Sequence, residues 1–276
     1  MNHPDDPVEH ELDEELPRPR RKGVYVLPNL FTLAALFGGF YAIVMAMNGR
    51  FEQSAIGIFC AMVLDSLDGR VARMTNTQST FGEQMDSLSD MVSFGAAPAL
   101  IVYEWALTGM GKLGWLAAFI YCACGALRLA RFNTNISVVD KRFFQGLPSP
   151  TAAALVMGFI WVIDDAGYKD VGVQQSWLAW SALALTLFAG LTMVTNLPFY
   201  SFKEFSLKRT VPFVVTVAIA LAIALVMVHP PIVLFAIFCI YAVSGYGVYG
   251  WKKMKGRRAS LIAMSTDAPE EEGLHR

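Results

Sequence analysis

The chain has 276 residues, of which 55% are hydrophobic and only 16% are charged, and its formal net charge is −1. Soluble domains carry about 25% charged residues, so this composition excludes an ordinary soluble domain and favours a protein of the lipid bilayer. We expect no nucleic-acid partner.

Long apolar runs predict an all-α fold, a polytopic membrane helical bundle. A spanning helix needs about 20 mostly apolar residues, and by that rule we predict about eight transmembrane helices, with six as the alternative count. No strands are expected, because the runs are long and do not alternate. The predicted spans are residues 26–47, 51–73, 80–106, 113–132, 149–165, 176–197, 210–228 and 230–250.

The charge distribution predicts the orientation in the membrane. With the higher count of spans, the basic clusters all fall on one side. The positive-inside rule then places both termini in the cytoplasm, and we expect an integral protein of a prokaryotic inner membrane. The clusters are Arg18–Lys22, Lys141–Arg142, Lys203–Arg209 and Lys252–Arg258.

Acidic residues inside the second and third predicted spans are the most informative feature. Asp65 and Asp68 are three residues apart, and Asp86 and Asp90 are four apart, so each pair projects from one side of a helix. A charged residue at the bilayer centre costs about 2.5 kcal/mol or more. Two helices that each offer two carboxylates can form an oxygen-rich pocket of the kind that suits Mg²⁺ or Mn²⁺.

The segment Met74–Gly82 connects the two aspartate pairs. It contains Asn and Thr residues and no long apolar run, so it is predicted to be a short cytoplasmic turn. Ser79 or Thr80 is the candidate N-cap of the third span. The turn therefore brings both pairs together near the cytoplasmic interface, where soluble substrates can reach them.

The spacing of these residues resembles a family signature. Read from Asp65, the chain has the pattern D-x2-D-G-x2-A-R-x8-G-x3-D-x3-D, which also specifies Gly69, Ala72, Arg73 and Gly82. This pattern is similar to that of the CDP-alcohol phosphotransferase family. The resemblance implies a catalytic core over residues 24–200. Composition predicts a disordered acidic then basic tail over 1–23, further transmembrane helices over 201–251 and a second cytoplasmic tail over 252–276.

The resemblance also implies roles for individual residues. Two divalent ions, Mg²⁺ or Mn²⁺, would be held by the aspartates, and Asp90 would act as the base or as a ligand of the second metal ion. Small residues would admit a ligand close to the helix backbone; close packing between helices is the alternative explanation for glycines in spans. The expected nucleotide or diphosphate contacts are Asn29 and Thr32 at the start of the first span, with Gly69, Ala72, Arg73 and Gly82.

Three further stretches resemble the phosphatidylserine synthase branch of that family: Arg128–Asn133, Phe144–Pro150 and Thr195–Lys203. This resemblance implies transfer of phosphatidyl from CDP-diacylglycerol to L-serine, with release of CMP, by a homodimer. Another acceptor such as glycerol 3-phosphate, inositol phosphate or choline, and more distantly transport of divalent cations, are the alternatives.

The carboxylate of serine needs a cationic partner. Arg128 and Arg131 are three residues apart at the cytoplasmic end of the fourth span, and Lys141 and Arg142 follow in the next loop. We expect these four residues to bind the acceptor or a phosphate. Snorkelling at the interface is the alternative role for the arginines.

Overall fold

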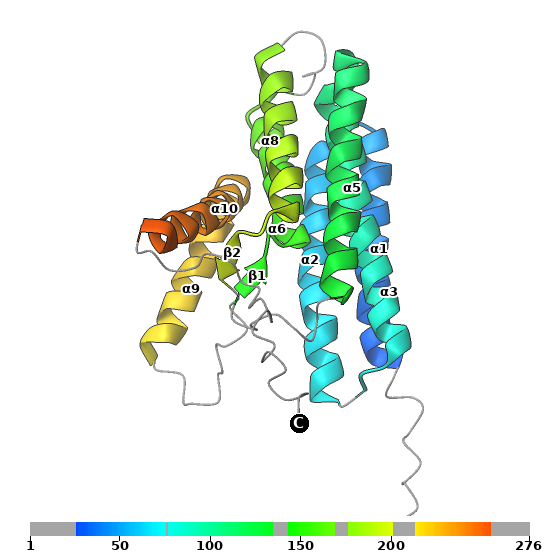
Figure 1. Ribbon diagram of the computed structural model, residues 1–276, viewed down its shortest axis with the longest axis vertical. Helices are drawn as coiled ribbons and strands as arrows, with labels where there is room; N and C mark the ends of the chain where they lie inside the picture. The colour runs from blue at the N-terminus through cyan, green and yellow to red at the C-terminus, as the bar shows by residue number, and fades with distance from the viewer. Residues whose placement is uncertain (1–25, 76, 135–142, 169–175, 201–212, 255–276) are drawn as a thin grey trace, which may run out of the picture.

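The computed structural model describes residues 26–75, 77–134, 143–168, 176–200 and 213–254, and helices dominate these residues (Figure 1). The helices of the main bundle run nearly parallel or antiparallel, with the start of α1, the end of α2 and the start of α3 at one end of the molecule (Figure 1). The predicted helical bundle is therefore confirmed.

The first two helices form a closely packed antiparallel hairpin. α1 (Val26–Met47) is followed by α2 (Phe51–Met74), and Gly49, with a φ of +69°, lies in the turn between them. Small residues let the two backbones approach: a Cβ placed on Gly38 would lie 3.1 Å from the carbonyl oxygen of Gly57. This close packing fixes α2 relative to α1.

The third predicted span is interrupted twice. α3 (Thr80–Asp90) continues into a π-helical turn (Met91–Ala96), then α4 (Ala97–Val102), a second π-helical turn (Tyr103–Leu107) and a 3₁₀ turn (Thr108–Met110). Pro98 has no N–H to donate to the preceding turn, which helps to explain the irregular stretch before it. The first π-helical turn begins directly after Asp90, and such turns are frequent at functional sites.

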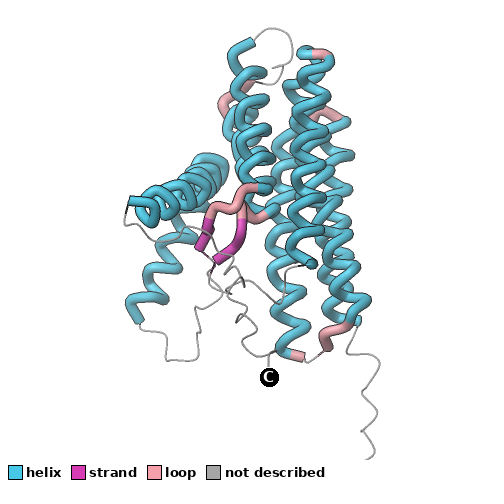
Figure 2. Tube along the Cα trace, in the orientation of Figure 1, coloured by secondary structure: helices cyan, strands magenta, loops and turns pink. Residues whose placement is uncertain are grey.

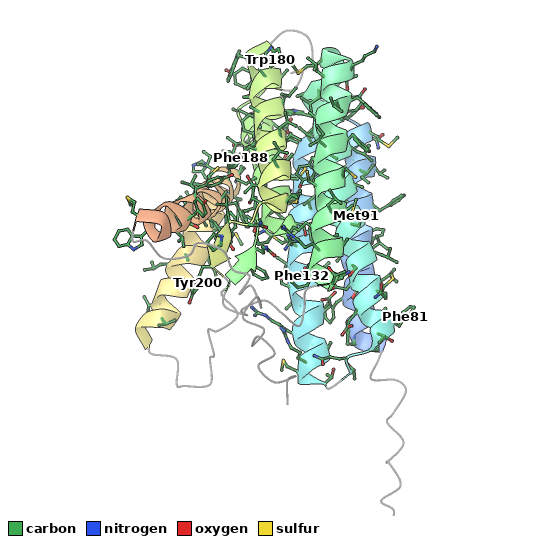
Figure 3. The ribbon with its side chains drawn as sticks, in the orientation of Figure 1. Phe81, Met91, Phe132, Trp180, Phe188 and Tyr200 are labelled. Carbon is green, nitrogen blue, oxygen red and sulfur yellow. The ribbon has the colours of Figure 1, made fainter. Side chains whose placement is uncertain are left out.

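Three more helices complete the main bundle: α5 (Lys112–Thr134), α6 (Ser149–Asp165) and α8 (Ser176–Val194). α6 is the most buried of these helices, and it packs against α2, α8 and α10. Apolar side chains also cover the outside of the bundle. Phe81 and Trp180, for example, are 66% and 54% exposed and project outward (Figure 3). This exterior suits contact with lipid chains.

A two-stranded sheet corrects the expectation that the chain has no strands. β1 (Phe143–Gln145) pairs antiparallel with β2 (Pro198–Tyr200), with Phe144 opposite Phe199. Figure 2 shows how short this pair is beside the helices. Each strand has three residues, too few for an alternating pattern to be recognised in the sequence.

Two helices follow the strand pair, α9 (Phe213–Val228) and α10 (Pro230–Met254), and both lie to one side of the main bundle (Figure 1). Every predicted span contains a helix, but five helical segments in the described ranges are long and apolar enough to cross a membrane. α2 carries several charges, and α6 and α9 have 17 and 16 residues. A count of eight therefore stays a prediction.

Candidate active site

Three carboxylates meet between α2 and α3, two helices that both pack against α1. Oxygen atoms of Asp65, Asp68 and Asp86 all lie within 4.8 Å of one another. The carboxyl group of Asp65 also interacts electrostatically with that of Asp90. The structure thus brings together the two pairs that the helical spacing predicted to converge.

Thr32 of α1 orients one of these carboxylates. Its Oγ1 donates a hydrogen bond of 2.7 Å to Oδ2 of Asp68, and both side chains are buried. The sequence analysis placed Thr32 among the nucleotide contacts, whereas the structure places its hydroxyl against Asp68. A hydrogen bond to a carboxylate is worth more than one between neutral groups, so Thr32 holds Asp68 in a defined rotamer.

The start of α3 has the predicted cap. Ser79 is the N-cap, and its Oγ accepts a hydrogen bond of 3.1 Å from the backbone N–H of Gly82. This interaction satisfies one of the free N–H groups at the beginning of the helix. It also fixes the turn that brings Asp86 toward α2.

Two serines that the sequence analysis did not single out attach this segment to α1. Ser89 donates to the carbonyl oxygen of Thr32 at 3.2 Å, and Ser93 donates to that of Ala35 at 3.1 Å. Gly39 makes room for Ser93, because a Cβ on Gly39 would lie 2.5 Å from the Ser93 Oγ. Serines at i and i+4 beside an aspartate would have been the sequence signal for this contact. Ser89, Ser93 and Gly39 therefore fix where Asp86 and Asp90 lie along the axis of α1.

A cavity of about 220 Å³ opens beside the carboxylates. The residues predicted to contact the nucleotide all line it, together with Asp68 and Asp86. A Cβ on Gly69 would meet nothing within 4 Å, so the backbone of α2 is open to a ligand at this point. The predicted residues in its lining are Asn29, Thr32, Gly69, Ala72, Arg73 and Gly82.

Asp90 and Arg128 form the other end of the site. Arg128 is buried, Asp90 is partly buried with its Oδ1 shielded from solvent, and the two charges interact. Within the described residues, Oδ1 of Asp90 and Nε of Arg128 have no hydrogen-bond partner, whereas the NH1 nitrogen of Arg128 donates to Oγ of Ser149 at 2.7 Å. Buried polar atoms are almost always paired. A free acceptor and a free donor in one charged site therefore indicate a place for a polar ligand.

Arg131, one helical turn further along α5, has different surroundings. Its terminal nitrogens donate to the end of α8, to the end of β1 and to Asn196. The structure thus separates two arginines that the sequence analysis treated together. Lys141 and Arg142 lie outside the described residues.

The chain is also similar to known proteins. The model of the CDP-alcohol phosphatidyltransferase family matches residues 25–188. A protein of Helicobacter pylori named CDP-diacylglycerol–serine O-phosphatidyltransferase is 34% identical over 228 residues, which cover 83% of this chain and 92% of the relative. Proteins of the same name in Methanocaldococcus jannaschii and Mycobacterium leprae are 36% identical over 190 residues (68% of this chain, 82% of the relative) and 29% identical over 231 residues (82% and 75%).

Proposed function

Because this chain belongs to the CDP-alcohol phosphatidyltransferase family, we propose that it transfers phosphatidyl from CDP-diacylglycerol to L-serine, giving phosphatidylserine and CMP. The names of relatives that cover most of the chain support serine as the acceptor. The observation that carries the proposal is the contact between a carboxylate cluster and a cavity lined by the small residues of the signature.

The aspartates suit divalent ions, and we assign Asp65, Asp68 and Asp86 to the first ion. Three carboxylates that can place oxygen atoms within 4.8 Å of one another provide the hard donor set that Mg²⁺ or Mn²⁺ prefers. Asp90 is assigned to a second ion or to proton transfer. When bound, two such ions would offset the negative charge of the diphosphate and the charge that develops on its oxygens as the leaving group is displaced from phosphorus.

The cavity beside the cluster is assigned to the cytidine diphosphate part of the donor. Gly69, Ala72 and Gly82 put little side-chain volume into its lining. Asn29 offers an amide, and Arg73 offers a guanidinium to phosphate oxygens. Thr32 reaches the same cavity but acts mainly through Asp68.

The acceptor is assigned to the space beside Asp90 and Arg128. Nε of Arg128 is free to donate to the carboxylate of serine, and Oδ1 of Asp90 is free to accept the proton of the attacking hydroxyl. The oxygen of serine forms a bond to the phosphorus that carries diacylglycerol, the bond from that phosphorus to the bridging oxygen breaks, and CMP leaves with that oxygen.

Several further assignments rest on the sequence. Lys141 and Arg142 would add positive charge for the acceptor or for phosphate. Residues 24–200 would form the catalytic core. A cytoplasmic tail (1–23) would precede it, and further transmembrane helices (201–251) and a second cytoplasmic tail (252–276) would follow it. The active site would face the cytoplasm from a prokaryotic inner membrane, and the enzyme would work as a homodimer. The helices that are apolar enough to span a bilayer support the membrane location.

The test is release of CMP by the purified protein in detergent, with CDP-diacylglycerol and Mg²⁺ or Mn²⁺. Serine, glycerol 3-phosphate, inositol phosphate and choline would be offered one at a time. Metal-dependent release with serine alone is expected. Release only with another acceptor would refute serine but keep the family chemistry, and no release with any acceptor would refute the transfer itself.

A further inference from the structure

We infer that Arg131 is a positioning residue, which ties the turn before α6 to the end of α8 and thereby places Ser149 and Arg128 for the acceptor. The inference rests on the proposed function, because it takes Arg128 to be an acceptor contact. It assigns Arg131 a role other than direct contact with the substrate, although its spacing from Arg128 would allow either.

The guanidinium of Arg131 is surrounded by protein oxygens. NH1 lies 3.0 Å from the carbonyl oxygen of Val194 and 3.1 Å from Oδ1 of Asn196. NH2 lies 3.2 Å from the carbonyl oxygen of Met193 and 3.3 Å from that of Thr195. The last carbonyl groups of a helix have no partners within the helix, and a cation there is favourable. Arg131 therefore caps α8 from a neighbouring helix.

The same side chain reaches the first strand. NH2 of Arg131 is also 3.4 Å from the carbonyl oxygen of Gln145, the last residue of β1. A single guanidinium thus joins α5, the end of α8 and β1. Arginine is suited to this task, because its planar fork presents several donors in a fixed geometry, whereas lysine offers one compact charge.

The turn after β1 lies directly against the end of α8. Gly146 has a φ of +76°, and a Cβ there would collide with the carbonyl oxygen of Met193. The N–H of Gly146 donates to the carbonyl oxygen of Leu197 at 2.9 Å, and the N–H of Leu147 donates to that of Thr192 at 3.2 Å. Any movement of the end of α8 therefore moves this turn.

The turn leads immediately to the partner of Arg128. Pro148 is the N-cap of α6 and Ser149 is its first residue. Oγ of Ser149 accepts the hydrogen bond of 2.7 Å from NH1 of Arg128. α5 thus holds the turn at both ends, through Arg131 at Gln145 and through Arg128 at Ser149. Loss of the first contact should loosen the second and leave Arg128 less well oriented.

The experiment compares Arg131→Ala, Arg131→Lys, Ser149→Ala and the double variant Arg131→Ala/Ser149→Ala with the unmodified protein. The KM for serine should rise about tenfold in both single alanine variants, the equivalent of one lost hydrogen bond to a charged group. The KM for CDP-diacylglycerol should stay within about twofold, because no residue of this turn belongs to the lining of the cavity beside the aspartates. Added guanidinium ion should restore part of the activity of Arg131→Ala. The Arg131→Lys variant should be less active than the unmodified protein.

The double variant separates positioning from direct binding. If both residues act through the orientation of Arg128, their effects on KM will not add. If Arg131 itself binds the substrate, the effects will add, and that result would overturn the inference. Arg50→Ala is the matched control, because Arg50 is an exposed arginine in the turn between α1 and α2 and should change neither constant.

A readout that needs no turnover keeps the inference separate from the proposed function. Hydrogen exchange should speed up at the amides of Gly146 and Leu147 in Arg131→Ala but not in Arg50→Ala. Unchanged exchange at these amides would overturn the inference. If the unmodified protein transfers to a different acceptor, the proposed function fails, while the exchange result still decides whether Arg131 fixes the turn.

Discussion

The hydroxyl of Thr32 on α1 is 2.7 Å from Oδ2 of Asp68 on α2, so the first helix orients a carboxylate of the cluster that the second helix supplies. The bond is buried, and thus water cannot readily replace it. It links the element at the start of the first helix to the aspartate motif, two features that are 36 residues apart in the chain.

Thr32→Val should lower kcat/KM about tenfold or more while the protein stays folded. Valine keeps the shape of threonine and removes the donor, and a hydrogen bond to a charged group contributes about 1.5–3 kcal/mol. The measurement is CMP release over a titration of Mg²⁺. Thr32→Ser keeps the hydroxyl and should retain most of the activity. Equal activity of the valine and serine variants would show that the bond to Asp68 is not needed.

Asp68→Asn and Asp86→Asn should each abolish turnover without loss of folded protein. Each change removes a negative ligand from the cluster and keeps the side-chain size, so binding of a divalent ion should suffer most. Turnover and elution from a size-exclusion column in detergent would be measured together. Glu52→Gln, at the other end of α2, is the control. Near-normal turnover in either aspartate variant would contradict the metal assignment.

Gly39→Ala should lower both thermal stability and activity. The new Cβ would lie 2.5 Å from Oγ of Ser93 and 2.7 Å from its Cα, so the segment that carries Asp90 must move away from α1. Overpacking of this kind costs about 1–3 kcal/mol. Gly247→Ala is the control, because a Cβ there meets nothing within 4 Å. Its melting temperature should equal that of the unmodified protein.

Gly69→Ala should separate stability from activity. A Cβ at this position meets no neighbour, and alanine is the better helix former by about 1 kcal/mol, so the variant should be at least as stable as the original. The methyl group lies in the lining of the cavity, however, and the KM for CDP-diacylglycerol should rise severalfold. An unchanged KM would show that the donor does not approach α2 at Gly69.

Arg128→Lys should raise the KM for serine about tenfold, the equivalent of 1.4 kcal/mol. Lysine keeps the charge beside Asp90 but loses the fork that can serve Ser149 and a ligand together. Arg128→Met should be more severe and should also destabilise the protein, because it leaves the partly buried Asp90 without its cation. Initial rates over a serine series would test this, and a rise confined to the KM for CDP-diacylglycerol would contradict it.

The sequence contained enough information to predict the helices and the meeting of the aspartates. Apolar runs predicted the helices. The spacing within the pairs Asp65/Asp68 and Asp86/Asp90 predicted that each pair lies on one side of its helix. Local chemistry predicted an N-cap at Ser79 or Thr80, and the structure has it at Ser79. All of these features depend on residues close together in the chain.

The remaining features depend on distant partners. β1 and β2 are more than 50 residues apart, and each is too short for a recognisable period. Arg128 and Arg131 lie one turn apart on α5, and their different partners, Ser149 of α6 and Met193 of α8, are distant in the sequence. The π-helical turn after Asp90 likewise has no pattern that marks it in a single sequence.

The two halves of the site come from different stretches of the chain. Residues of the cavity and the carboxylate cluster lie between Pro28 and Asp90, whereas Arg128 and Ser149 belong to later helices. If Arg128 binds the acceptor as proposed, the choice of alcohol can change without altering the residues that bind the nucleotide-linked lipid. Exchanging the region from α5 to β2 between relatives should therefore give an enzyme whose lipid product carries a different head group.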